Sequence, residues 1–265
     1  MTDRDPTLGP APRSRRVWPW VVAVFLIVLV AAVIALVETV GRGIAVSAIE
    51  QQVRTSLDVP PETPVGVELG GGSLALQALT GRVDQVDVTV DPLELGPLTG
   101  ELLIEARGVP LDQSAPVGEL HVSYRVPEDA LSAITDYLSG VQISSVSLDD
   151  AELVAEGEVS LLGMTLPLGL GLTPGASDGV LTFTPTSIRI GDATFDAAAL
   201  ASDRFWGDAA RTLTQTRSVC IADQLPAAFT LEDVRVDGDE LVVVLDGSGA
   251  ALGGTELRTK GVCPA

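Results

Sequence analysis

Residues 119–126 read ELHVSYRV, and in this stretch apolar and polar side chains alternate without a break. Residues 86–91, VDVTVD, repeat the same period of two. Successive side chains of a β-strand point to opposite faces of the sheet, so each stretch is typical of a strand with one buried and one wet face. The pattern therefore predicts a mostly antiparallel sheet as the main element of the fold.

Shorter apolar runs bounded by turn residues predict further strands. These cover residues 102–106, 141–148, 153–161, 166–172, 180–184, 187–190, 231–236 and 241–245. Asp178-Gly179 and Asp237-Gly238 are turn signals that close hairpins. The strands therefore form a meander.

Three segments predict helices instead of strands. Helical spacing in the first, residues 44–56, is carried by Ile44, Ala48, Ile49, Val53 and Leu57. The second, residues 127–140, opens at a proline and stops at a glycine, and the third is an Ala-rich stretch over residues 195–216. The chain is thus expected to be an α+β protein.

The composition argues against nucleic-acid binding and gives little material for catalysis. The chain contains 16 Lys and Arg and 36 Asp and Glu, which gives a net charge of −20. This charge repels the phosphate backbone of nucleic acids, and the sequence has no local basic patch that could bind it. The single histidine, His121, has no nucleophile motif beside it, and the acids around Asp149 follow the polar positions of a strand. We expect no catalytic residue, no metal site, no cofactor and no enzymatic activity.

Residues 17–37 predict one transmembrane helix. They form a run of 21 uncharged residues, which at about 1.5 Å per residue spans roughly 30 Å, one hydrocarbon core. Arginines are concentrated before this run, which predicts a cytoplasmic N-terminus. A cleaved signal peptide is the alternative, with a weak cleavage sequence at residues 45–48, but its apolar region is normally shorter.

This orientation divides the chain into four parts. Residues 1–16 form a disordered cytoplasmic tail, 17–37 the span, 38–64 an amphipathic helix with a Pro-rich connector, and 65–265 one extracytoplasmic domain. The protein is expected in the cell membrane with a single pass. An oxidising compartment permits a disulfide between the only two cysteines, Cys220 and Cys263, and a metal or redox pair is the weaker alternative.

Residues 74–86, LALQALTGRVDQV, resemble the opening motif of the LmeA-like phospholipid-binding family of actinobacterial cell envelopes. The predicted anchor, the segment LPAAFTLEDVRVDGDELVVVLDG at residues 225–247, and the late Gly261-Val262-Cys263 agree with it. The resemblance implies a curved, mostly antiparallel sheet wrapped around helices, which encloses an elongated apolar groove for phospholipid acyl chains. It also implies a role in envelope lipid or lipoglycan assembly.

Candidate groove residues are apolar side chains that the predicted elements turn inward, although packing in an ordinary core is the commoner role for each one. They are Leu74, Leu76, Leu79, Val86, Val88, Leu102, Ile104, Val122, Tyr124, Leu131, Ile134, Leu168, Leu170, Phe183 and Ile190. The candidates for a phosphate headgroup are Arg82, Arg107 and Arg125, because guanidinium groups match phosphate oxygens.

The expected partners are the membrane itself and a phospholipid or related envelope lipid, with a membrane enzyme as a further partner. The alternative function is a non-enzymatic scaffold or regulator of such an enzyme, with a filled core and no ligand. A filled core and a groove share one hydrophobic pattern, so the sequence leaves both open.

Overall fold

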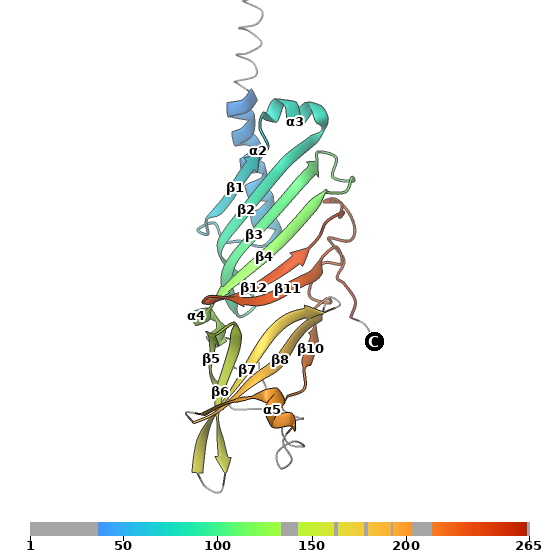
Figure 1. Cartoon of the computed structure of the whole chain (residues 1–265). Coiled ribbons are helices and arrows are strands. Elements are labelled where there is room, and N and C mark those ends of the chain that lie inside the picture. The colour runs from blue at the N-terminus through green and yellow to red at the C-terminus, as the bar shows by residue number, and fades with distance from the viewer. Residues whose placement is uncertain are drawn as a thin grey trace, which may run out of the picture.

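A computed structural model describes residues 37–133, 143–161, 164–177, 180–191, 193–202 and 214–263. Every pairing between its named strands is antiparallel, as the alternating stretches predicted. The prediction of a single meander is wrong, because the strands form two open sheets that follow one another along the molecule (Figure 1). Alternation shows that a segment is a strand but not which strand lies beside it.

The first sheet is six-stranded and joins the two ends of the domain. Its spatial order is β1 (Val65–Gly70), β2 (Arg82–Leu95), β3 (Leu98–Pro110), β4 (Glu119–Pro127), β12 (Glu240–Asp246) and β11 (Thr230–Asp237). The predicted turn at Asp237-Gly238 is present between β11 and β12, where Gly238 has a φ of 66°. β12 pairs with β4, so a late hairpin completes a sheet begun by the early strands.

The second sheet is built from the middle of the chain. Its order is β10 (Arg217–Cys220), β8 (Val180–Ile190), β7 (Met164–Ser177), β6 (Glu152–Leu161) and β5 (Ile143–Asp149), with β9 (Ala193–Asp196) also paired to β8. The two strands predicted at 180–184 and 187–190 are one strand. Pro185 lies where the register between β7 and β8 shifts, a position where the missing N–H of proline is tolerated.

The helices of the described chain agree only in part with those that the sequence predicted. A π-helical turn η1 (Val37–Gly41) leads into α2 (Arg42–Ser56), which confirms the helix expected at 44–56. The helix predicted at 127–140 begins as α4 (Glu128–Leu131), and residues 134–142 lie outside the described residues.

The prediction of a helix over residues 195–216 is wrong about where the helix begins. Phe195 and Asp196 belong to β9, and α5 (Ala197–Ser202) begins only after them. The Asp196 carboxylate accepts the Ala199 N–H at 2.7 Å, as a residue that precedes a helix does. Residues 203–213 lie outside the described residues, and residues 217–220 form β10.

One helix, α3 (Leu74–Thr80), was not predicted. It is only seven residues long, too short for a clear helical period. Its ends carry recognisable signals, since Ser73 precedes it and Gly81 follows it with a left-handed φ of 71°. The candidate groove residues Leu74, Leu76 and Leu79 therefore lie on a helix that the sequence did not predict.

The main core lies on one face of the first sheet and continues into the second. Val90 and Val126 are almost fully buried there, and Val146 and Leu153 extend the same cluster into β5 and β6. α2 lies along this face of the first sheet (Figure 1). Its inward side chains are Ala45, Val46, Ile49 and Val53, followed by Leu57, while Ile44 and Ala48 point outward, contrary to expectation.

The predicted disulfide is present. Cys220 at the end of β10 is bonded to Cys263, with the two Cα atoms 5.9 Å apart. The bond ties the end of the described chain to the second sheet. No helix in the described residues is long and apolar enough to cross a membrane, and all of the predicted span except Val37 lies outside them.

Candidate functional site

The inner face of the second sheet carries two rows of apolar residues that run across five strands. Residues that face each other in an antiparallel register lie on the same side of a sheet. The first row is Val146, Ala155, Leu170, Ile188 and Phe195, and the second row is Ile143, Gly157, Leu168, Ile190 and Ala193. We call these ten residues the apolar rows.

A cavity of about 110 Å³ opens on the apolar rows. Its walls are formed by Ile143, Ala155, Glu156, Gly157, Leu168, Gly169, Leu170 and Ile188. Ala155 and Gly157 supply little or no side chain between the leucines of β7 and Ile143 of β5, which leaves the space unfilled. Toward β9, Ile190 and Phe195 remain 44% and 42% exposed, so the apolar rows continue toward solvent.

The opposite face of the same sheet is polar and internally paired. Arg189 binds Asp149 through Nη2 and Oδ2 at 2.7 Å, and the Ser187 hydroxyl donates to the Glu152 carboxylate at 2.7 Å. The hydrogen bond to Asp149 raises the pKa of Arg189 above its ordinary value. Asp149 and Glu152 therefore serve an ion pair and a hydrogen bond, and the described residues contain no group of ligands suited to a metal ion.

A second, polar cleft of about 480 Å³ lies near the start of α4, next to β5. Its walls are Pro127, Glu128, Asp129, Ser132, Val146 and Asp239. The Glu128 carboxylate accepts the Leu148 N–H at 3.1 Å and so fixes α4 against β5. Val146 belongs both to this cleft and to the apolar rows, so the polar cleft adjoins one end of the apolar face.

The candidate groove residues fall into several environments. Leu168 and Leu170 line the cavity, and Ile190 lies in the apolar rows. The first sheet and α4 bury most of the others against protein atoms: Val86, Val88, Leu102, Ile104, Val122, Tyr124 and Leu131. Leu74 packs against the same core, whereas Leu76 and Leu79 are exposed on α3.

The side chain of Tyr124 is buried in the packed core of the first sheet and leaves no room there for a ligand. Its hydroxyl donates to the carbonyl oxygens of Leu93 and Leu98 at 2.9 and 3.1 Å, and burial raises its pKa to about 12. Phe183 is half-buried on β8 opposite Pro174, outside the apolar rows. Ile134 lies outside the described residues.

The three candidate headgroup arginines lie on the first sheet and not beside the cavity. Arg82, Arg107 and Arg125 are all exposed, and Arg107 pairs with Glu119 at 3.3 Å. Six residues of the cavity wall were missed as site residues: Ile143, Ala155, Glu156, Gly157, Gly169 and Ile188. The signal that could have found them is the pair of small residues at alternate positions of β6, but its meaning depends on the register with β7.

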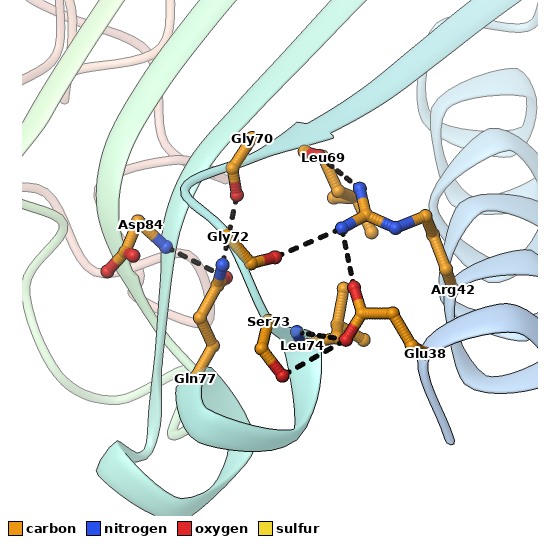
Figure 2. Close-up of polar contacts among 9 residues, drawn as sticks. All are labelled: Glu38, Arg42, Leu69, Gly70, Gly72, Ser73, Leu74, Gln77 and Asp84. Carbon is orange, nitrogen blue, oxygen red and sulfur yellow. Dashed lines mark hydrogen bonds and ion pairs between the residues drawn. The ribbon is translucent and has the colours of Figure 1, made fainter. Parts of the chain in front are cut away.

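The motif at residues 74–86 has a structural role at the other end of the molecule (Figure 2). The buried Gln77 side chain donates to the Gly70 carbonyl at 3.0 Å and accepts the Asp84 N–H at 3.1 Å, so it ties α3 to both β1 and β2. The Glu38 carboxylate accepts the Leu74 N–H at 2.8 Å and the Ser73 hydroxyl at 3.1 Å.

Arg42 completes this junction between α2 and α3. It binds Glu38 at 2.9 Å and donates to the carbonyl oxygens of Leu69 and Gly72. The hydrogen bonds from Arg42, from the Leu74 N–H and from Ser73 lower the pKa of the Glu38 carboxyl, so it stays ionised. We call Glu38, Arg42, Ser73 and Leu74 the Glu38 junction.

Comparison with known proteins gives one match. The family model described as LmeA-like phospholipid-binding matches residues 36–246, from the predicted end of the span through β12. No curated protein and no solved structure matches the chain.

Proposed function

The chain belongs to the LmeA-like phospholipid-binding family, and from that premise we propose that it holds a phospholipid-like molecule by an acyl chain on the apolar rows of the second sheet. The observation that carries the proposal is the cavity bounded by Ala155, Gly157 and Leu168, which is open and almost wholly apolar. The equivalent face of the first sheet is packed.

The size of the cavity limits what it can take. Pockets for whole small molecules measure about 300 to 1,000 Å³, whereas this one measures about 110 Å³. It therefore receives one segment of a chain, and the remaining methylenes lie along the apolar rows toward Ile190 and Phe195. Each buried methylene contributes about 0.8 kcal/mol, so such binding is reversible.

In the proposed cellular setting, residues 17–37 anchor the protein in the cell membrane and the domain that follows lies outside. The Cys220–Cys263 disulfide supports this orientation, because such bonds persist in oxidising compartments. The protein would shuttle or present an envelope lipid without chemical turnover, next to a membrane enzyme that uses it. The LmeA-like family description supports the lipid as ligand.

Photochemical labelling tests the site. The full chain is reconstituted in phosphatidylcholine vesicles that contain a trace of phosphatidylglycerol with a diazirine in one acyl chain, and labelled peptides are mapped by mass spectrometry. We expect label on β6, β7 and β8 around Ala155, Leu168 and Ile188. Label on residues 17–37 is the internal control for incorporation. Label confined to residues 17–37 and adjoining surfaces would contradict lipid binding at the cavity and favour the ligand-free scaffold.

A further inference from the structure

Five exposed apolar side chains gather at the end of the molecule where the described chain begins. Leu79 and Leu76 of α3 are 84% and 64% exposed, and Ile44 of α2 is 64% exposed. Val40 and Leu111 are exposed as well. Leu111 is held next to α3 because its N–H donates to the Gly81 carbonyl at 2.9 Å. Figure 1 shows α3 beside the start of α2 at this end.

The Glu38 junction ties α3 to the first residues of the described chain (Figure 2). Glu38 follows directly after the uncharged run of residues 17–37. Its carboxylate lies 2.8 Å from the Leu74 N–H, at the first residue of α3. α3 therefore begins within the length of one side chain of the residue at which the uncharged run ends.

We infer that α3 is a membrane-docking element, which inserts Leu76 and Leu79 into the surface of the phospholipid bilayer beside the span. This inference rests on the anchor in the proposed function. A seven-residue helix is about 10 Å long and cannot cross a bilayer, but short amphipathic elements bind by burying an apolar face at the headgroup boundary. α3 supplies such a face next to the point where the chain leaves the membrane.

The charges at this end are compatible with an interfacial position. Glu38, the acid nearest the span, is paired with Arg42 and so brings no uncompensated charge. Arg82, exposed directly after Gly81, lies where a lipid phosphate would be in reach. A bilayer surface therefore fits the chemistry of this end, although the chain as a whole is strongly acidic.

Docking through α3 orients the domain. β2 begins just after α3 and runs for 14 residues, which at about 3.3 Å each carries its far end roughly 40 Å away. Leu95 at that end is also exposed and provides a matched control. The second sheet lies at the opposite end of the molecule from α3 (Figure 1), so the cavity lies outside the bilayer. A lipid in the cavity has then left the anchoring membrane.

The test uses the full chain in vesicles of phosphatidylcholine and phosphatidylglycerol. Two variants, Leu79→Cys and Leu95→Cys, carry an environment-sensitive fluorophore, and spin-labelled lipids with shallow or deep nitroxides quench it. We expect a blue shift and strong shallow quenching at position 79, and an aqueous spectrum without quenching at position 95. An aqueous, unquenched label at both positions would overturn the inference.

A second measurement separates docking on lipid from burial against protein. The fluorophore is placed at Leu111→Cys, and Leu76 and Leu79 are both changed to serine. We expect the ratio of docked to undocked molecules to fall about tenfold for each leucine removed. The fall is measured as a loss of quenching by the spin-labelled lipids. A label at position 79 that is blue-shifted but not quenched by any lipid indicates a protein partner or a second copy, and also overturns the inference.

The quenching measurements and the photochemical labelling together distinguish this inference from the proposed function. Quenching at position 79 without photochemical label near Ala155 contradicts lipid binding at the cavity and leaves docking intact. Photochemical label near Ala155 together with an aqueous spectrum at position 79 contradicts docking and leaves lipid binding at the cavity intact. A chain that fails to float with the vesicles contradicts the anchor, and with it the docking.

Discussion

Filling the cavity with a ring should strongly weaken lipid binding while the fold persists. The change is Ala155→Phe, which directs a phenyl ring from β6 toward Leu168 and Leu170. An apolar cavity of about 150 Å³ accommodates benzene, so a ring fills the cavity of about 110 Å³ here. The matched control is Glu158→Phe, which adds the same ring at an exposed position on the other face of β6.

The size of the effect follows from the volume. With about 30 Å³ for each water-sized group, the cavity holds about three to four methylenes, and at about 0.8 kcal/mol each their burial contributes about 3 kcal/mol. Displacing them should weaken binding about 100-fold. Overpacking a core costs about 1 to 3 kcal/mol, and a ring that enters an existing cavity should remain at the low end of that range.

The assay is a fluorescence titration of residues 38–265 with a pyrene-labelled phosphatidylglycerol, run beside thermal unfolding of each variant. Residue 38 is the chosen start because the Glu38 junction is then intact. An Ala155→Phe variant that melts like the wild type and still binds with unchanged affinity would refute the assignment of the cavity. Equal losses in Ala155→Phe and Glu158→Phe would show that the ring acts through the sheet and not through the cavity.

Three further predictions concern the fold. Reducing the Cys220–Cys263 bond, which closes a loop across a sequence separation of 43, should lower the free energy of unfolding by about 4 kcal/mol in the chain-entropy model; denaturant unfolding with and without reductant measures it, and an unchanged midpoint would contradict it. Because the pKa of Tyr124 is raised from 10.0 to about 12, the folded state holds the phenolic proton longer than the unfolded state, so its contribution to stability is present below pH 10 and lost as the pH rises through about 12. The difference in unfolding free energy between wild type and Tyr124→Phe should shrink over that interval, and a constant difference would argue against the shift. Leu131 is fully buried, so the change Leu131→Ala should lower the free energy of unfolding by about 2 to 5 kcal/mol. A loss below about 1 kcal/mol in denaturant unfolding would show that the start of α4 is not part of the core.

Local pattern determined many of the elements. Period two in residues 86–91 and 119–126 predicted β2 and β4, and helical spacing predicted α2, because both signals depend only on neighbours in the chain. The disulfide followed from there being only two cysteines. The motif at residues 74–86 and the features after it pointed to the family that residues 36–246 match.

Tertiary structure decided the division into two sheets and the location of the open space. β4 pairs with β12 across more than 100 residues of chain, and no local period records that choice. Leu102 and Leu168 occupy equally apolar strands, yet one is buried in a packed core and the other lines a cavity. Ala155 and Gly157 leave that cavity only because the register places them opposite Leu170 and Leu168.

The same division applies to the end that we assign to the membrane. The sequence by itself provided the uncharged run of residues 17–37 and the leucines of α3. Only the fold brought Glu38 to Leu74 across 36 positions and left Leu76 and Leu79 in solvent. Hydrophobicity and periodicity are properties of a segment, whereas burial and contact depend on what the rest of the chain places against it.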